Sequence, residues 1–474
     1  MLPKMNHFPF VLALALGMTS GLVACSSTPI STPVLPPAPI AFKEARLFVP
    51  ANPAAADVPD EWWTLFNDPV LNKLQTRLVA GNPNLQASAA AVATAQAALG
   101  TSRASLMPAV NLSGGVTRSG NVSGSTVGTT ATSYTLQGGL ASWELDLWGR
   151  LSANVDAASA HLQSSRDTLA ATRLSLQATL VQTYFSLRAA QAMAALIAQT
   201  VESYEKSLQL TQNRYQGGVA AASDVAQAQT QLKSAQAQQL EVRLQRDQLE
   251  HALALLLGLA PSDFEVLPSP LLAQGGLPTP PVVPSQLPST LLERRPDIAA
   301  AERQVVAANA QINAAQAAFF PAVTLSASSG FRNGDLGNLL QTAHRFWSIG
   351  PSVALSVFDG GARDVARDAA RANYDQTVAT YQQTVLVALQ EVEDNLVAAA
   401  VLQDETVVQQ AALSAARRAL DIVQNQYKAG TVSYLNVVAA QTAALTAESN
   451  LLTVRNRHLA AVNQLLKNIA GRWS

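Results

Sequence analysis

The fold is decided by residues 151–216, which read LSANVDAASAHLQSSRDTLAATRLSLQATLVQTYFSLRAAQAMAALIAQTVESYEKSLQLTQNRYQ. The stretch contains no glycine and no proline, although globular helices usually run only about 8–20 residues. Leu162, Leu169 and Leu176 recur at the heptad spacing that is typical of a coiled-coil seam. A helix of this length would extend about 100 Å. Because a second run without glycine or proline covers 362–429, the sequence predicts two long helical rods.

The chain contains an internal repeat. Pro83–Pro108 matches Pro296–Pro321, and each segment ends on a proline, which cannot continue a helix. Farther along, Gln212-Asn213-Arg214-Tyr215 matches Gln424-Asn425-Gln426-Tyr427 at nearly the same offset. The sequence therefore predicts two copies of one unit, each with a short helix, two strands, a long helix and a returning helix.

The predicted boundaries follow from the glycines and prolines between these segments. In the first repeat, residues 60–270, we expect a short helix, strands 109–119 and 132–146, a long helix 149–216 and a returning helix 219–257. In the second repeat, residues 296–474, we expect a helix 296–320, strands 322–332 and 346–358, a long helix 361–429 and a returning helix 431–470. Gly217, Gly218 and Gly430 stand where each long helix must reverse, a turn that needs positive φ.

The predicted strands alternate apolar with polar residues. Val323 and Leu325, for example, alternate with Thr324 and Ser326, the period-2 pattern of a sheet with one apolar face. Near Ser142 the parity changes, which indicates a bulge or a bend. Each segment is about 10 residues long, the span of a tilted transmembrane strand. On periodicity alone, a soluble sheet with one apolar face is the alternative.

The strands of one chain cannot close a barrel in a membrane. Spanning barrels begin at about eight strands, and an open edge in lipid leaves backbone groups unpaired. We therefore expect several copies of the chain to pool their strands. A dimer would give an eight-stranded barrel with a filled interior, whereas a trimer would give twelve strands and room for a lumen.

The amino terminus reads as a secretory signal, residues 1–24, followed by a lipoprotein motif. Lys4 precedes an apolar stretch, as in signal peptides. Leu22-Val23-Ala24-Cys25 resembles the bacterial lipobox, which predicts that Cys25 becomes the acylated first residue. Ser26 follows the cysteine. In lipoproteins of this kind, a residue other than aspartate at this position resembles a signal for sorting to the outer membrane. Residues 25–59 would form an extended tether. The alternative is an unmodified cysteine within a signal peptide.

The sequence offers no catalytic or metal-binding set. Its single cysteine excludes an intrachain disulfide, and its five histidines are scattered. The helical carboxylates Glu391, Glu393 and Asp394 are expected on solvated faces or in contacts between helices. A net charge of −1 does not favour nucleic acid as a partner. We therefore expect no enzyme and no cofactor apart from the covalent lipid on Cys25.

Two motifs resemble the outer-membrane factors of the TolC and OprM type, which include the NodT type. They are RRPDIAAAE at Arg294–Glu302 and AAQAAFFP at Ala314–Pro321. The resemblance covers nearly the whole mature chain and is greatest to the acylated lipoprotein branch. It implies a mostly helical α+β membrane protein, a homotrimer with a twelve-stranded β-barrel in the outer membrane. A periplasmic α-barrel of twelve helices would continue it, with a mixed equatorial domain that includes the linker 258–295.

The resemblance also implies a function and partners. The chain would be the outer-membrane channel of a tripartite efflux system, a passive exit duct for drugs, organic solutes or metal ions. Its partners would be outer-membrane lipid, a periplasmic adaptor and an inner-membrane pump of the RND type. Two alternatives remain: an exit channel for type I protein secretion, and a structural periplasmic coiled-coil lipoprotein without a pore.

Candidate gate residues follow from the same resemblance. Asp224 aligns with a tip aspartate of the family, and Tyr427 with a tyrosine that participates in closing the pore. The family's tip arginine is Val432 here, and two acids of the constriction align with Asn436 and Ala439, so the electrostatic lock is not intact. We expect an entrance held shut by hydrogen bonds and packing around Tyr427, Asn436 and Asp224. The remaining tip residues, which turn geometry alone would also explain, are Gly217, Gly218, Gly430 and Thr431.

Overall fold

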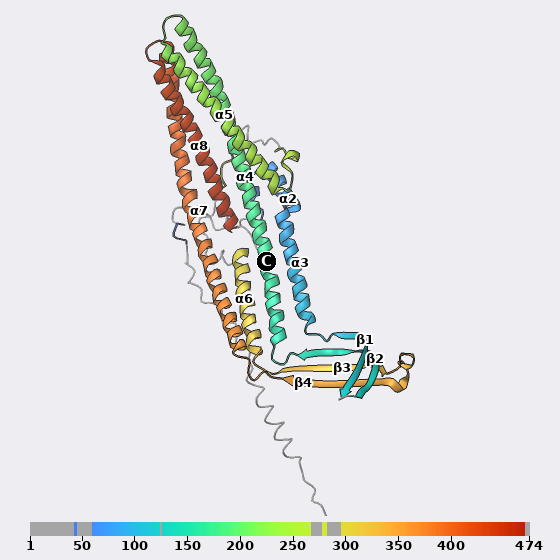
Figure 1. Cartoon of the computed structure of the whole chain (residues 1–474). Helices are drawn as coiled ribbons and strands as arrows, with labels where there is room; N and C mark the ends of the chain where they lie inside the picture. Colours follow the sequence, from blue (N-terminus) through green and yellow to red (C-terminus); the bar gives the residue numbers. More distant parts are fainter. Residues whose placement is uncertain (1–41, 45–58, 124–125, 267–276, 282–294, 470–474) are drawn as a thin grey trace, which may run out of the picture. The chain divides into compact units, whose positions relative to one another are not determined.

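The computed structural model describes residues 42–44, 59–123, 126–266, 277–281 and 295–469 (Figure 1). The chain forms two compact units, each built from separate segments. We call the described residues of Ala91–Ser165 and Ala300–Tyr381 the sheet unit, and the described residues of Leu35–Ala90, Arg166–Ala299 and Gln382–Ser474 the helical unit. The predicted signal segment, Cys25 and most of the predicted tether and linker lie outside the described residues.

The sheet unit contains a four-stranded antiparallel sheet with the order β1-β2-β3-β4 (Figure 1). The strands are β1 Val110–Ser123, β2 Thr126–Leu145, β3 Ala322–Asn333 and β4 Arg345–Ala354. The sequence predicts a last strand that reaches residue 358, whereas β4 ends at Ala354, because Ala354 pairs with Ala322, the first residue of β3. The first two strands are longer than predicted, because β1 and β2 pair with each other as far as Ser123 and Thr126.

The pairing register gives the sheet one apolar and one polar face. The apolar face carries Val110, Leu112 and Val116 of β1, Tyr134, Leu136 and Leu140 of β2, Val323, Leu325, Ala327 and Phe331 of β3, and Trp347, Ile349 and Val353 of β4. The polar face carries Asn111, Ser113, Thr117, Ser133, Thr135, Gln137, Thr324, Ser326, Ser328, Ser348 and Ser352. Hydroxyl groups bridge neighbouring strands there, with 2.9 Å between Ser328 Oγ and Ser348 Oγ. The predicted alternation is therefore a property of the whole sheet.

A β-bulge keeps the apolar face continuous along β2. The pairing of β2 with β3 shifts between Leu140 and Trp143, which confirms the irregularity predicted near Ser142. Beyond the shift, Trp143 pairs with Leu325 on the apolar face. Without the extra residue, every later side chain of β2 would point to the opposite face.

The sheet leaves two backbone edges open. In the described chain, β1 pairs only with β2 and β4 pairs only with β3. The apolar side chains are also uncovered, since Leu112 is 79% exposed and Ile349 is 63% exposed. A broad exposed apolar surface with free edges is prone to associate. The open edges could accept partner strands, and the exposed apolar face would be more stable in an apolar environment.

The helices are α2 Pro69–Gly81, α3 Pro83–Ala104, α4 Arg150–Gln216, α5 Ala222–Leu256, α6 Pro296–Ala317, α7 Ala362–Lys428 and α8 Tyr434–Ile469 (Figure 1). Short 3₁₀ turns are η4 Trp62–Phe66, η5 Pro261–Asp263, η8 Leu336–Asn338 and η9 Thr342–His344. The order of a helix, two strands, a long helix and a shorter one occurs twice. No helix of the described segments is both long enough and apolar enough to cross a membrane.

The short helices end a few residues before their predicted ends. α3 stops at Ala104 and α6 at Ala317, because the next residues form tighter turns. Leu106 N donates to Arg103 O at 3.1 Å, and Phe320 N donates to Ala317 O at 3.2 Å. Such bonds across three residues are usual where an α-helix unwinds.

Acidic side chains fix the starts of the long helices. Asp146 accepts hydrogen bonds from the backbone N–H groups of Leu151 (2.9 Å) and Ser152 (2.7 Å) at the start of α4. Burial alone would raise the pKa of Asp146, but the hydrogen bonds from Ser152 and Leu151 outweigh it, so the pKa is lowered. At the start of α7, Asp359 accepts from Gly361 N at 3.0 Å. A carboxylate at a helix N-terminus is favourable, and it holds each long helix close to the strand that precedes it.

Buried polar groups tie the helical unit together. The Nε1 of Trp62, which is fully buried, donates to Asn463 Oδ1 of α8 at 3.1 Å. Asn463 Nδ2 in turn donates to Ala178 O of α4 at 2.9 Å. Asp68 caps α2 and accepts a hydrogen bond from the Tyr184 hydroxyl of α4. The pKa of Tyr184 is raised, mainly because the hydroxyl is buried and secondly because it donates this hydrogen bond to Asp68.

In the first repeat, an asparagine joins the end of α5 to the start of α3. Asn82 Nδ2 donates to Leu256 O at 2.7 Å. Its Oδ1 accepts from the backbone N–H of Asn84 at 2.8 Å, which caps α3. One amide therefore satisfies backbone groups of both helix ends.

In the second repeat, an arginine occupies the corresponding position at the start of α6. Buried Arg295 donates to Asn468 Oδ1 near the end of α8 at 3.2 Å and to Glu391 Oε2 of α7 at 3.1 Å. Burial alone would lower the pKa of Arg295, but hydrogen bonds and the charges of Asp297 and Glu391 outweigh it, so the pKa is raised. The two copies thus use different chemistry at equivalent junctions.

The first prediction concerns the close approach of β2 and β3 at Gly139. A Cβ there would lie 2.2 Å from Ala327 O, whereas a Cβ at Gly115, on the same polar face, would have nothing within 4 Å. Gly139→Ala must therefore move backbone, and we expect it to destabilise the protein by about 1–3 kcal/mol. Gly115→Ala should be neutral or slightly stabilising. Thermal unfolding followed by circular dichroism measures both, and equal midpoints for the two variants would contradict the packing of this sheet.

Candidate functional site

The candidate site consists of the two turns that reverse the long helices. In the first turn, between α4 and α5, Gly218 has φ +75°, and in the second, between α7 and α8, Gly430 has φ +79°. Val219 N donates to Arg214 O at 2.9 Å in the first turn, and Thr431 N donates to Gln426 O at 3.0 Å in the second.

These bonds make both turns Schellman motifs, in which glycine supplies the left-handed residue. The motifs occupy several residues, which explains why α5 and α8 begin at Ala222 and Tyr434, later than predicted. Gly217 has no positive φ, and its N–H continues the helical pattern by donating to Asn213 O at 3.0 Å.

A buried cluster of two tyrosines lies beside the second turn. Tyr427 and Tyr434 pack edge to face with ring centroids 5.5 Å apart. Ala228 of α5 and Val437 of α8 complete this tyrosine cluster. Its two hydroxyl groups meet hydroxyls of α4: Thr211 Oγ1 lies 3.4 Å from the Tyr427 hydroxyl, and Ser207 Oγ lies 3.3 Å from the Tyr434 hydroxyl. Burial raises the pKa of Tyr434. The cluster therefore joins α4, α5, α7 and α8.

Arg214 of α4 connects the first turn to the second. Its guanidinium carbon lies 4.8 Å from the centre of the Tyr427 ring, a cation–π distance. Its Nη1 donates to the carbonyl oxygen of Tyr427 at 3.1 Å, at the C-terminal end of α7. The last carbonyls of a helix carry partial negative charge, so a guanidinium is favourable there. Arg214 thus binds both the ring and the backbone of Tyr427.

The structure separates the predicted gate residues. Tyr427 lies in the cluster, but neither Asp224 nor Asn436 forms a hydrogen bond with it in the described chain. Asp224 is half-buried near the start of α5, and its charge contributes to raising the pKa of Tyr434. Asn436 is exposed, because Tyr434 and Val437 occupy the buried side of α8. Thr431 stabilises the second turn, because its Oγ1 donates a hydrogen bond to Gln426 O at 3.0 Å.

Sequence reasoning missed Arg214 and Tyr434. The repeat aligns Arg214 with Gln426 and Tyr215 with Tyr427, and this difference between the copies is the signal that could have found the arginine. Tyr215 is 50% exposed whereas Tyr427 is 5% exposed, so the matching tyrosines have different environments. The difference between Arg214 and Gln426 in the two repeats does not show that Arg214 contacts the turn of the second repeat.

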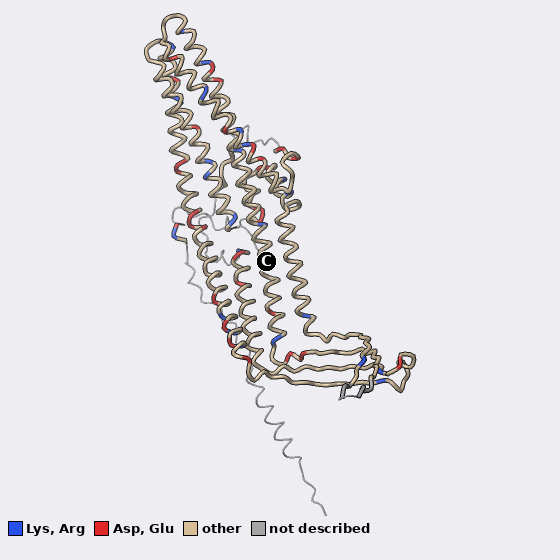
Figure 2. Tube along the Cα trace, viewed as in Figure 1, with Lys and Arg blue, Asp and Glu red and all other residues tan. Residues whose placement is uncertain are grey.

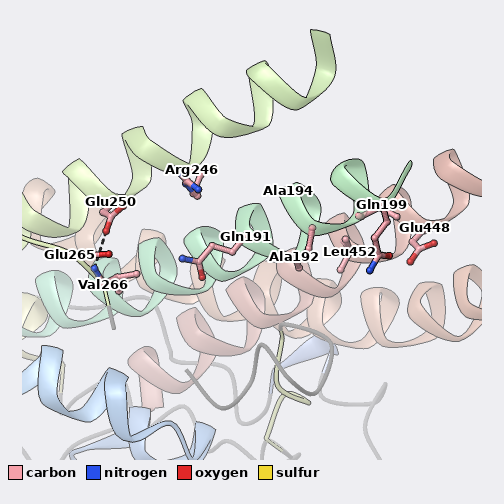
Figure 3. Close-up of a pocket in the computed structure, with 12 residues that line it drawn as sticks. Gln191, Ala192, Ala194, Gln199, Arg246, Glu250, Glu265, Val266, Glu448 and Leu452 are labelled. Carbon is pink, nitrogen blue, oxygen red and sulfur yellow. Dashed lines mark hydrogen bonds between the residues drawn. The ribbon is translucent and has the colours of Figure 1, made fainter. Parts of the chain in front are cut away.

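The helical unit also contains an open cleft of about 650 Å³ between α4, α5 and α8 (Figure 3). Its polar lining includes Gln191, Arg246, Glu250 and Glu448. Glu250 accepts the backbone N–H of Val266 at 2.9 Å, as the dashed line in Figure 3 marks. Arg246 pairs with Asp247 and Glu448 with Arg417, each at 2.6 Å. Arg246, Glu250 and Glu448 are thus engaged in structural contacts. Among the described residues, no group of three or more His, Cys, Asp or Glu side chains could hold a metal ion.

Comparisons with known proteins relate the chain to outer-membrane components of efflux pumps. The family model described as outer membrane efflux protein matches residues 74–259 and 287–471. The toluene efflux pump outer membrane protein TtgC of Pseudomonas putida is 30% identical over 448 residues, which cover 92% of this chain and 91% of that protein. The outer membrane protein OprJ of Pseudomonas aeruginosa is 32% identical over 466 residues, covering 98% and 96%.

The fold is also similar to that of a solved outer-membrane channel. The structure of OprN superposes with a TM-score of 0.85 at 29% identity, covering 93% of this chain and 100% of that one. The similarity therefore extends over the sheet and the helices, not over one of them alone.

The second prediction concerns the bond between Arg214 and the second turn. A hydrogen bond from a charged donor contributes about 1.5–3 kcal/mol, so Arg214→Met should speed amide exchange at Gly430 and Thr431 roughly tenfold to a hundredfold. Lys206→Met is the matched control, because the pair of Lys206 with Glu202 on the same helix is exposed. Hydrogen–deuterium exchange with mass spectrometry measures both. Unchanged exchange at the turn in Arg214→Met would contradict the contact.

Proposed function

The chain belongs to the outer membrane efflux protein family, and we propose that it is the outer-membrane channel of a tripartite efflux system. In this role it is a passive exit duct in the outer membrane, and it performs no enzymatic step. The observation that carries the proposal is the sheet, which has one apolar face, one polar face and two open edges.

The sheet fits the wall of a barrel made of several chains. Its apolar face suits lipid and its polar face suits a water-filled lumen. The free edges of β1 and β4 would be paired when β4 of one copy lies beside β1 of the next. Three copies would pool twelve strands and leave a lumen, whereas two copies would give a filled barrel. We therefore favour a homotrimer.

The long helices suit a periplasmic conduit. In a trimer, α4, α5, α7 and α8 of three copies would supply the twelve helices of an α-barrel, and α3 and α6 would extend the shorter ones. The two turns would then recur around a common axis. This arrangement makes the turns, with the tyrosine cluster and Arg214, the candidate entrance of the channel.

The proposed partners follow from the family and from the sequence. An acyl chain on Cys25 would anchor the chain in the outer membrane, with the helices in the periplasm. A periplasmic adaptor would connect the turns to an inner-membrane pump of the RND type. The similarity to proteins described as efflux pump outer membrane proteins supports this assembly.

The class of transported compound is proposed from the relatives. Their descriptions name efflux of toluene, antibiotics and solvents, and we propose organic solutes of this kind for the present chain, with metal ions as a second class. Export of polypeptides by a type I system is a different use of the same duct. A structural lipoprotein without a pore would not need a sheet with an apolar outer face.

The third prediction tests the channel itself. Purified protein should migrate as a heat-sensitive trimer in mild detergent and conduct ions in planar lipid bilayers. A deletion strain should become more sensitive to toluene and to antibiotics, and the intact gene should restore resistance. A monomer in lipid, or the absence of conductance, would contradict the proposal. Loss of a secreted polypeptide with unchanged susceptibility would favour type I secretion.

The fourth prediction concerns closure of the entrance. Tyr427→Ala removes the ring that packs on Tyr434 and lies beneath Arg214, so it should loosen the tyrosine cluster and increase conductance severalfold. Tyr427→Phe keeps the ring and loses only the 3.4 Å contact with Thr211, so it should conduct like the unmodified protein. Single-channel recording compares the two variants. Equal conductance of Tyr427→Ala and the unmodified channel would show that the cluster has no part in closure.

A further inference from the structure

Two arginines lie on the apolar face of the sheet. Arg118 stands two residues after Val116 on β1, and Arg345 pairs with Phe331 of β3, so the register assigns both to the face that carries the aliphatic and aromatic residues. Both are exposed. The guanidinium carbon of Arg345 lies 5.7 Å from the centre of the Phe331 ring. Neither arginine forms an ion pair with another residue that the structure describes.

Both arginines lie toward the ends of the strands that are remote from α3, α4, α6 and α7. Arg345 is the first residue of β4, and Arg118 is in the second half of β1. Figure 2 shows that the basic positions of the strands gather toward the β1–β2 and β3–β4 connections. On the same face, Tyr134 and Trp347 lie nearby in the register, and Trp347 is 78% exposed. Aromatic residues in such a band are typical of a membrane interface.

An arginine on a lipid-facing surface needs an anionic partner or water. It is strongly unfavourable at the middle of a bilayer and tolerated near the head groups. A guanidinium binds phosphate with two parallel hydrogen bonds, and basic residues at membrane surfaces recognise anionic head groups. If the helices are periplasmic, the loop ends of the strands face the outer leaflet, which in the outer membrane carries phosphorylated glycolipid.

We propose that Arg118 and Arg345 bind the phosphate groups of outer-leaflet glycolipid, with Tyr134, Phe331 and Trp347 packing against its acyl chains. β1 and β4 are the two edge strands of the sheet. Pairing of β4 with β1 of a second copy would therefore put the two arginines on adjacent strands, where they face the same lipid. This inference rests on the proposed function, because it takes the sheet to lie in the outer membrane.

The chain provides a matched control on the opposite face. Arg332 pairs with Thr135 of β2 on the polar face, and its guanidinium carbon lies 4.9 Å from the centre of the Phe346 ring. It therefore belongs to the same end of the sheet but would face the lumen. A lipid that binds the apolar face should depend on Arg118 and Arg345 and should not depend on Arg332.

The test is native mass spectrometry of the full-length trimer in detergent, titrated with lipid A that carries two phosphates. Phosphatidylethanolamine and inorganic phosphate are the comparison probes. We expect lipid A to be retained in preference to both. The double variant Arg118→Gln/Arg345→Gln should bind it roughly tenfold to thirtyfold more weakly. Arg332→Gln should bind like the unmodified protein. Arg118→Lys/Arg345→Lys keeps the charges but loses the paired hydrogen bonds, so it should bind more weakly than the unmodified protein and more tightly than the double glutamine variant.

The outcomes separate this inference from the proposed function. If the trimer conducts but the double glutamine variant binds lipid A normally, the lipid site is wrong and the channel stands. Equal binding of phosphatidylethanolamine, or full competition by inorganic phosphate, also overturns the site. If the double variant does not assemble, the lysine variant and the Arg118→Gln and Arg345→Gln single variants decide the question. If the unmodified chain forms no trimer, the proposed function itself fails.

Discussion

The open backbone edges of β1 and β4 constrain the rest of the molecule. Each unpaired N–H or C=O group in hydrocarbon costs several kcal/mol, and a sheet of four strands cannot close on itself. In the proposed barrel, its edges would therefore be paired by other copies. The constraint reaches the helices through short connections, because Asp146 directly follows β2 and caps α4, and Asp359 lies in the short segment between β4 and α7 and caps α7. A symmetry imposed on the strands is thereby imposed on the starts of the long helices.

In the helical unit, buried side chains join helix ends and provide hydrogen-bond partners for the polar groups there. The first repeat uses the amide of Asn82, whereas the second uses the guanidinium of Arg295 with Glu391 and Asn468. Asp297 is part of this second junction: burial would raise its pKa, but the hydrogen bond and charge of Arg295 lower it. The second junction therefore depends on charge, and it should weaken as the pH falls through the lowered pKa of Asp297. The two junctions occupy matching positions before α3 and α6 but use different side chains.

Features with a local cause could be predicted from the sequence. Period-2 alternation predicted the two faces of the sheet, the parity change near Ser142 predicted the bulge, and Gly218 and Gly430 marked the left-handed turns. Features that depend on distant partners could not. The end of β4 is set by the first residue of β3, and the contact of Arg214 with Tyr427 joins α4 to α7. No periodicity encodes such contacts.

The two turns form one structure rather than two equivalent ones. Their sequences match, yet Tyr215 is exposed and Tyr427 is buried, because the first turn contributes Arg214 and the second contributes the ring and carbonyl that it binds. In a trimer there would be three such pairs, not six equal turns. Any movement that separates the ends of α4 and α7 must break the hydrogen bond of Arg214 and its contact with the ring. If the turns form the entrance, as proposed, its opening would require either that Arg214 and Tyr427 move together or that Arg214 first releases Tyr427.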